Sequence, residues 1–363
     1  MRGDDTQQTA MYSYINPEDR IAQNHPLRQI RQMMDVALGE LWAHFESLYA
    51  RRGRPSIPPE RVLRALLLQV LYSIRSERQL MEQLEYNLLY RWFVGLNPDD
   101  AIWDVTVFTK NRERMLGGEV SQRLFESVLK QASEHKLLSE EHFTVDGTLI
   151  EAWASRKSFV PKDPPPSKGS GHGGEKLLRD THESKTDPEA RLYKKSTAGQ
   201  ARPSYLGHVL IENRRGLVVE ACVTQSSTTA EREAALAMLD RRGRSPDKIG
   251  PDTVPITLGA DKLFQEAQFV NALRQRKVVP HIAEYEPGKN AWKNSLTDAE
   301  RQDPGFGISQ RKRKLVEKIF GWGKLDSTLR QTKLRGVNKV DWWFRFLATA
   351  ANLVRMVKLI PAV

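Results

Sequence analysis

Three acidic residues stand where separate elements of secondary structure could together bind divalent metal ions. Asp146 lies within residues 143–150, a short apolar run typical of a β-strand. Asp261 follows a second strand-like run at 254–258, and Glu317 lies in a basic segment with helical periodicity. Phosphodiester cleavage by two metal ions requires carboxylates from different elements that hold the ions about 4 Å apart. Because Mg²⁺ prefers oxygen ligands and keeps some of its waters, three such carboxylates would suffice.

Two of the three acids also have a purely structural interpretation when they are taken singly. Asp261 could cap a helix that follows it, and Glu317 could pair with Arg313 at helical spacing. Asp146 differs from both, because a carboxylate within an apolar strand is costly unless it is paired or bound to a metal ion. Only the joint arrangement, on a strand, a strand end and a helix, favours a metal site.

The first part of the chain has the periodicity of helices. Apolar residues recur at helical spacing over 62–74, after two prolines, and Ser76 has the type and spacing of a helix cap. Further helices are expected at about 106–115 and 120–136. We therefore expect an all-helical N-terminal domain over residues 1–138.

The pattern then changes to strands that alternate with helices, which predicts an α/β domain over residues 139–363. After residues 143–150, the expected strands and helices, in chain order, are at 205–212, 217–224, 229–241, 254–258, 264–275 and 277–282. Residues 158–203 are rich in Pro, Gly, Ser, Lys and Asp, so we expect a mobile insert that cannot bury a core. The apolar segment 342–360 carries several charged side chains, which favours a packed helix.

Composition limits the class of protein. The 363 residues carry a formal net charge of +11, and the isoelectric point is about 9.6, so the chain attracts polyanions such as nucleic acid. Charge alone is equally compatible with a basic protein that has no such partner. The single cysteine, Cys222, excludes an intramolecular disulfide framework and a Cys-rich zinc site. No apolar run approaches a membrane span, so we expect a cytoplasmic location and no membrane partner.

The three acidic segments resemble the bacterial insertion-sequence transposases of the DDE type, families four and five. The strand FTVDGTLIEAWAS looks like the first-Asp strand, ITLGADKLF resembles the second-Asp segment, and RKRKLVEKIFGWGK matches the R-x3-E-x6-K signature through Arg313, Glu317 and Lys324. The resemblance spans most of the chain. It implies an RNase H-like mixed sheet with flanking helices. It also implies that Asp146, Asp261 and Glu317 are catalytic ligands of two Mg²⁺ ions, for which Mn²⁺ can substitute.

Two positions depart from the family pattern. The Tyr that precedes the signature Arg by three residues is replaced by Gln310, and the Gly after the second Asp-Lys is Leu263. A tyrosine that stacks on terminal bases is therefore not expected. Trp322 could offer its ring to an unstacked base, which is worth about 1–3 kcal/mol per base, or could pack into the core.

Basic residues surround Glu317 in the sequence. Between residues 311 and 345 there are eleven Lys and Arg and three acidic residues. We expect Arg313 and Lys324 to contact DNA next to the site, together with Arg311 and Lys314. A solvated helix face is the alternative for the basic residues that lie far from Glu317.

The resemblance implies a DNA transposase that cuts DNA at insertion-sequence ends and transfers the strands into target DNA. Its expected partners are the terminal inverted repeats, the target DNA and a second copy of the chain. The N-terminal helices would bind DNA ends, through a helix-turn-helix near residues 76–91, or would make dimer contacts. Two alternatives share the same residues: a non-catalytic DNA-binding protein derived from a transposase, and a metal-dependent nuclease without strand transfer.

Overall fold

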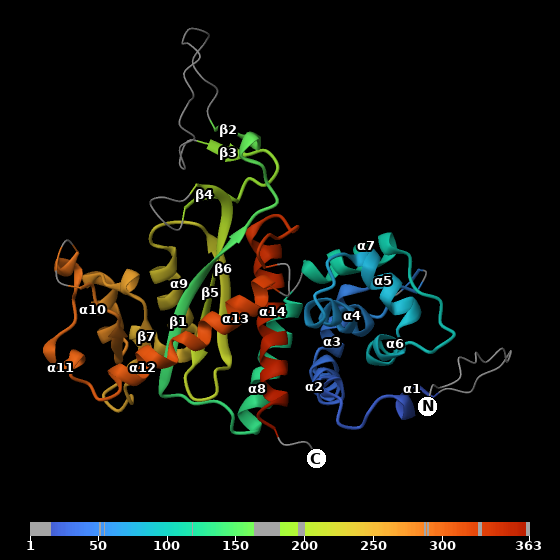
Figure 1. Cartoon of the computed structure of the whole chain (residues 1–363), viewed down its shortest axis with the longest axis horizontal. Coiled ribbons are helices and arrows are strands. Elements are labelled where there is room, and N and C mark those ends of the chain that lie inside the picture. Colours follow the sequence, from blue (N-terminus) through green and yellow to red (C-terminus); the bar gives the residue numbers. More distant parts are fainter. Residues whose placement is uncertain are drawn as a thin grey trace, which may run out of the picture.

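The computed structural model describes residues 16–360 except 51, 54, 118, 163–181, 195–199, 287, 289 and 326–328. Helices alone precede the first strand in this described part (Figure 1). They are α1 (Pro17–Arg20), α2 (Pro26–Glu40), α3 (Trp42–Leu48), α4 (Pro59–Leu71), α5 (Glu77–Tyr86), α6 (Leu88–Val94), α7 (Val105–Leu116) and α8 (Val120–Glu134). The helical character predicted for this part of the chain is confirmed.

Local sequence explains where these helices begin. Ser76 begins α5 as predicted, because its hydroxyl oxygen accepts a hydrogen bond from the backbone N–H of Gln79 at 3.1 Å. Residues 77–94 then form two short helices, α5 and α6. Between them Asn87 ends α5, and its side chain caps α6 through the backbone N–H groups of Leu89 and Tyr90.

The strands after α8 form one mixed sheet. Its main members are β1 (His142–Glu151), β5 (Arg202–Glu212), β6 (Val218–Gln225), β7 (Ile256–Ala260) and β8 (Val278–Ile282). β1 pairs antiparallel with β5 and parallel with β7; β6 is antiparallel to β5, and β8 is parallel to β7. The resulting order, β6-β5-β1-β7-β8, is that of an RNase H-like sheet, as expected.

The segment at 158–203 differs from the expected insert where it is described. β2 (Phe159–Pro161) pairs with β3 (His182–Ser184), and β4 (Arg191–Tyr193) extends the main sheet beside the start of β5. Polar contacts hold these short strands: buried Asp187 accepts a hydrogen bond from the Tyr205 hydroxyl at 2.7 Å. The Pro- and Gly-rich centre of the predicted insert lies outside the described residues.

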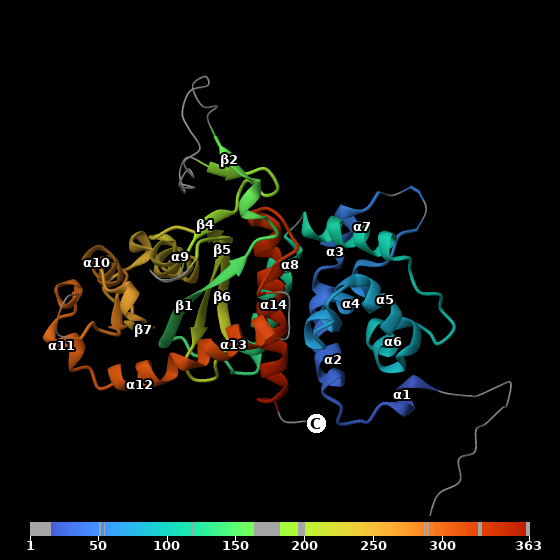
Figure 2. The ribbon, with the colours of Figure 1, turned by 45° about the horizontal axis from the view of Figure 1, so that its top comes forward.

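Helices cover the two faces of the sheet in different ways. α9 (Ala230–Leu239) and α10 (Ala267–Gln275) pack with Phe143 and Val145, which point to one face. The alternating residue Ile150 points to the other face and shares a core with α14 (Val337–Val357) and the N-terminal helices. α14 stands between the sheet and the helical part in both ribbon views (Figures 1 and 2).

Asn352 ties α14 to an edge of the sheet. Its amide oxygen accepts a hydrogen bond from the backbone N–H of Val218, and its amide nitrogen donates to the Val218 carbonyl, both at 2.8 Å. Val218 belongs to β6, which is an edge strand of the sheet that the described residues form. The predicted packed helix at 342–360 is confirmed in type, and no helix of the described chain is long and apolar enough to cross a membrane.

Three helices carry the chain from β8 to α14: α11 (Asp298–Arg301), α12 (Phe306–Lys312) and α13 (Lys314–Leu325). The basic segment predicted to be helical from 310 therefore divides at Arg313 into two helices. Both α12 and α13 contact β1. They place the Glu317 segment over the strand that carries Asp146.

Candidate active site

Asp146 and Asp261 stand level with each other on neighbouring parallel strands. Thr144 of β1 pairs with Gly259 of β7, and each Asp lies two residues further along its own chain. Side chains two residues apart in a strand point to the same face, and the backbone remains extended at Asp261. A Cβ atom on Gly259 would lie 3.0 Å from Oγ1 of Thr144, which shows how closely the strands approach on this face. Both carboxylates therefore occupy one end and one face of the sheet.

Each of these carboxylates already accepts a backbone hydrogen bond. The Asp146 side chain is half-buried, and its Oδ1 accepts from the backbone N–H of Gly147 at 2.7 Å. Oδ1 of Asp261 accepts from the backbone N–H of Leu263 at 2.7 Å and thereby caps the short 3-10 turn Lys262–Phe264. The capping interpretation of Asp261 is thus correct. Because a cap of this kind occupies one carboxylate oxygen, it is compatible with metal binding through the other.

Glu317 is exposed on α13, and the half-buried Lys324 follows on the same helix. The half-buried Arg313, between α12 and α13, has helical backbone angles and lies four residues before Glu317. Val316 and Phe320 are buried and fix the rotation of the helix against the core. Residues four and eleven apart lie on one side of an α-helix, so the three signature residues share a flank. Arg313 and Glu317 form no ion pair with each other, although both belong to the described chain.

The opposite flank of α13 shows which way Glu317 faces. Leu315 and Trp322 line a hollow of about 290 Å³ together with Arg215 and Gly216 of the β5–β6 turn. That turn lies beside the first residue of β1, because Asn213 donates its backbone N–H to the His142 carbonyl at 2.9 Å. The Glu317 flank therefore faces the other way along β1, towards its carboxyl end and the two aspartates.

Contacts from α12 hold this part of the chain on the sheet. The Ser309 hydroxyl lies 2.7 Å from Nδ1 of the fully buried His281, and the Gln310 amide donates to the His281 carbonyl at 2.6 Å. Burial lowers the pKa of His281, while Asp303, 3.4 Å from its Nε2, opposes that shift. Gln310, which departs from the family's Tyr, thus has a structural role in anchoring α12 to β8.

Glu231 is an acidic neighbour that the sequence did not single out. It lies in the first turn of α9, and its Oε1 would be 2.6 Å from a Cβ atom on Gly147, the residue after Asp146. The next residue, Arg232, forms an ion pair with Glu266 and donates to the Leu263 carbonyl beside Asp261. α9 therefore begins close to the backbone of Asp146, on the face of the sheet opposite to the Asp146 side chain. The Gly at 147 is the one signal that could have indicated a close approach here.

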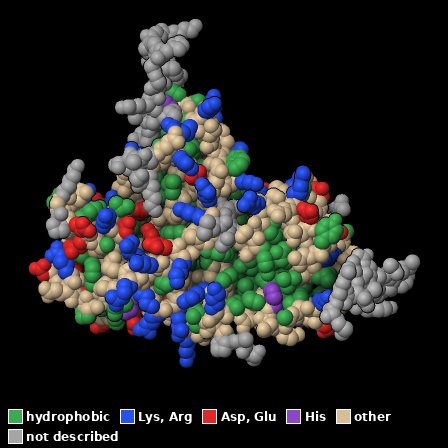
Figure 3. All heavy atoms as spheres, viewed as in Figure 1, with side chains coloured by type: hydrophobic (Ala, Val, Ile, Leu, Met, Phe, Trp, Pro, Cys, Tyr) green, Lys and Arg blue, Asp and Glu red, His purple; other side chains and the backbone are tan. Residues whose placement is uncertain are grey.

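The predicted DNA-binding residues fall into two groups. Figure 3 shows Lys and Arg side chains gathered over α12 and α13. Arg311 and Lys314 are exposed there, whereas Arg313 is half-buried and its Nε has no hydrogen-bond partner. Trp322 lies apart from Glu317, on the opposite flank of α13, and packs against the core while lining the 290 Å³ hollow. The structure therefore does not bring the Trp322 ring to the aspartates.

The chemistry of the donors fits Mg²⁺, because Asp146 and Asp261 supply oxygen ligands from two adjacent strands. The arrangement is incomplete in one respect. Within the described residues, no three His, Cys, Asp or Glu side chains stand close enough together to hold a metal ion. Two carboxylates are thus level with each other, and the third is carried on a helix over the same strand.

Two family profiles match the chain. A transposase domain (DUF772) matches residues 15–114, and a transposase DDE domain matches residues 276–357, which include Glu317. No curated protein sequence is significantly similar to the chain.

Solved structures of transposases are similar to it at low sequence identity. A cryo-EM structure of the piggyBac transposase synaptic complex with hairpin DNA is 9% identical, over 91% of this chain and 74% of that one, with a TM-score of 0.41. A pre-cleavage Mos1 transpososome is 12% identical, over 88% and 84% of the two chains, with a TM-score of 0.23. Both family matches are to transposase domains, and together they support a DDE transposase.

Proposed function

We propose that this chain is a Mg²⁺-dependent DNA transposase that cuts the ends of an insertion sequence and joins them to target DNA. The observation that carries the proposal is the level placement of Asp146 and Asp261 on neighbouring parallel strands, beneath a helix whose Glu317 flank faces the same end. Carboxylates from three elements are the set that two-metal phosphodiester chemistry uses. The match of residues 276–357 to a transposase DDE domain makes this the favoured use of the three acids.

Asp146, Asp261 and Glu317 would hold two Mg²⁺ ions, for which Mn²⁺ can substitute. When bound, the ions supply the Lewis acidity that phosphodiester displacement requires. Because Glu317 does not complete a ligand cluster with the aspartates in the described chain, we infer that α13 approaches β1, or that the Glu317 side chain turns, when metal ions and DNA bind.

The basic residues would position the DNA. Arg313 and Lys324 share the flank of Glu317, so they would neutralise phosphates next to the cut bond, and the exposed Arg311 and Lys314 would contact the backbone further out. Trp322 would stack on a base only away from the aspartates, at the hollow between α13 and α14.

The two domains would have different roles. Residues 1–138 would bind the terminal inverted repeats or form dimer contacts, and residues 139–363 would carry the chemistry. Pairing of two element ends implies a homodimer. Because α14 packs against both parts, the two proposed domains share one core.

The test is a coupled cleavage and joining assay with Mg²⁺, a duplex that carries the element end and a plasmid target. We expect a free 3′ hydroxyl first and joined products afterwards, with no protein attached to the DNA. Cutting without joining would identify a nuclease, and DNA binding without cutting would identify a repurposed binding protein. The triple variant Asp146→Asn, Asp261→Asn, Glu317→Gln is the control: it should bind the DNA and leave it intact, because every cationic side chain remains in place.

A further inference from the structure

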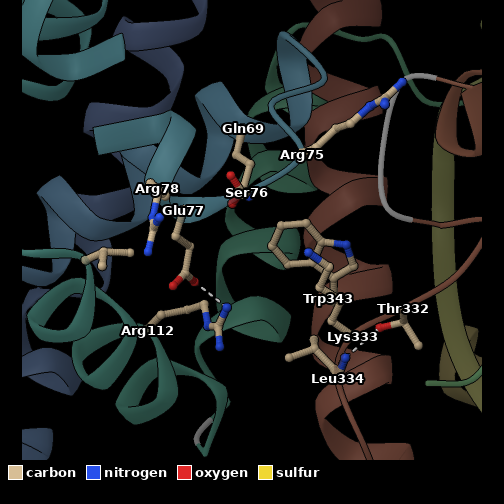
Figure 4. A pocket seen from close by; sticks show the side chains of 11 residues that line it. Gln69, Arg75, Ser76, Glu77, Arg78, Arg112, Thr332, Lys333, Leu334 and Trp343 are labelled. Carbon is tan, nitrogen blue, oxygen red and sulfur yellow. Dashed lines mark hydrogen bonds and ion pairs between the residues drawn. The ribbon is translucent and has the colours of Figure 1, made fainter. Parts of the chain in front are cut away.

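A hollow of about 310 Å³ lies between the helical part and the segment that leads into α14 (Figure 4). This size is at the lower end of the range of small-ligand sites. Side chains from four regions line the hollow. They come from the end of α4, the α4–α5 turn and the start of α5, from α7, from residues 332–334, and from Trp343 of α14. Figure 4 shows the Trp343 ring between the side chains of the two parts.

The rim of the hollow is strongly cationic. Arg75, Arg78 and Lys333 are exposed, and their side chains form no ion pair within the described chain. The only acid that lines the hollow in this part of the chain is Glu77, which is already engaged by Arg112 and by the hydroxyl of Thr109. Three unneutralised cations from two separate parts of the fold therefore surround one opening.

The floor of the hollow is largely apolar. Trp343 is 7% exposed, and Val105 and Leu334 are half-buried beside it. A ligand that fits must present both a negative charge to the rim and an apolar surface to the floor. The deoxyribose and phosphate of a DNA strand have this combination, and phosphates are contacted mainly by Arg and Lys.

The segment that carries Lys333 is joined directly to the strand of Asp146. Glu151, the last residue of β1, donates its backbone N–H to the Arg330 carbonyl at 3.1 Å, and its carbonyl accepts from Thr332 at 3.0 Å. Glu151 lies five residues beyond Asp146, which corresponds to about 17 Å along an extended strand. DNA rises about 3.4 Å per nucleotide of one strand. One DNA molecule at the aspartates would therefore pass this segment about five base pairs away.

We propose that this hollow is a second DNA-backbone site, at which Arg75, Arg78 and Lys333 grip the DNA about five base pairs from the cleavage point. The proposal rests on the proposed function, since it takes the bound polymer to be the element's terminal DNA. Because the cations come from both parts of the fold, the DNA would hold the helical part and β1 in one orientation.

Site-specific photo-crosslinking tests the proposal. Cys222 is buried, and burial raises the pKa of its thiol to about 11, so a new surface cysteine is the one reactive thiol of the described chain. Arg78→Cys places a benzophenone label on the rim. Lys248→Cys places it on the exposed 3-10 turn Pro246–Lys248, which precedes β7 and so lies at the end of that strand away from Asp261. We expect the label at 78 to crosslink to terminal DNA, and the label at 248 to give at most a trace.

Binding measurements separate this proposal from the proposed function. Arg78→Ala and Lys333→Ala should each lower the slope of log affinity against log salt by about 0.9, whereas Lys248→Ala should leave it unchanged. The proposal of a second DNA site would be wrong if both rim variants kept the wild-type slope, or if residue 78 crosslinked to a second protein chain. Neither outcome would contradict the proposed transposase function. Failure of the wild-type chain to bind or cut any element end would instead overturn the proposed function. Thermal unfolding of each variant confirms that it is folded.

Discussion

The Glu231 carboxylate lies directly over Gly147, so that a Cβ atom at residue 147 would stand 2.6 Å from its Oε1. The side chain can lie there only because residue 147 has no side chain of its own. Gly147 therefore lets an acid from α9 approach the backbone next to Asp146. Gly207 has a different neighbour: a Cβ atom there would lie 2.8 Å from two ring carbons of Phe344 in the core.

The two glycines should therefore respond differently to alanine. Glu231 has a flexible side chain whose carboxylate can shift away from the methyl group of Gly147→Ala, so we expect a loss of less than about 1 kcal/mol in the free energy of unfolding. Gly207→Ala presses on Phe344 and on Ile150, and overpacking of this kind costs about 1–3 kcal/mol. Urea unfolding of the two variants measures the difference. Equal losses would mean that the Glu231 side chain is held as rigidly as the core.

The sheet and the first aspartate could be predicted because their signals are local. The alternation around Asp146, the turn after Glu212 and the apolar run before Asp261 each indicate a strand within a few residues. The resemblance then supplied the strand order. The strands β2 to β4 were not predicted, because they are three residues long and are held by distant side chains such as Tyr205.

The surroundings of the acids could not be read from the sequence, because they depend on contacts across many residues. Glu231 contacts Gly147 although the two are 84 positions apart in the sequence, and His281 contacts Ser309, which is 28 positions away. The direction in which Trp322 points depends on how α13 is rotated about its axis. Burial of Val316 and Phe320 fixes that rotation, and their burial is known only once α13 is placed on the sheet.

The affinity for metal ions should depend on which carboxylates already lie at the site before DNA binds. In the absence of DNA, Asp146→Asn and Asp261→Asn should each weaken Mn²⁺ binding at least about 10-fold, since they stand level on adjacent strands. Glu317→Gln should change the affinity little until terminal DNA is added. Glu231→Gln should weaken binding less than either aspartate variant, because Glu231 approaches Gly147 from the face of the sheet opposite to the Asp146 side chain. Calorimetry with Mn²⁺ checks the order, and a large effect of Glu317→Gln without DNA would contradict the inferred movement of α13.

Arg313 and Lys324, the two cations of the signature, should each contribute to the salt dependence of DNA binding. Arg313→Ala and Lys324→Ala each remove one cation from a phosphate, so each should lower the slope of log affinity against log salt by about 0.9. Lys248→Ala, on the exposed turn before β7, is the matched control. If the slopes measured for both signature variants equal that of the control, Arg313 and Lys324 do not contact phosphates of the bound DNA.

Stability should fall in mild acid because of a buried histidine in β5. His208 is 1% exposed, its Nε2 lies 2.8 Å from the Thr224 hydroxyl, and burial lowers its pKa from 6.5 to about 3. In the unfolded chain His208 is therefore protonated as the pH falls below about 6.5, whereas in the folded chain it stays neutral until the pH is much lower. The contribution of His208 is complete above pH 6.5 and is lost as the pH falls from there towards the folded-state pKa.

His208→Gln isolates this contribution, because the glutamine amide can reach Thr224 as Nε2 does but does not titrate. Between pH 6.5 and about pH 4, the wild type should lose on the order of 3 kcal/mol more of its free energy of unfolding than the variant. The comparison is made as a difference because the pKa of His281 is also lowered by burial and remains in both proteins. Chemical unfolding at several pH values gives the two curves. Parallel curves would show that His208 accepts its proton in the folded chain as readily as in the unfolded one.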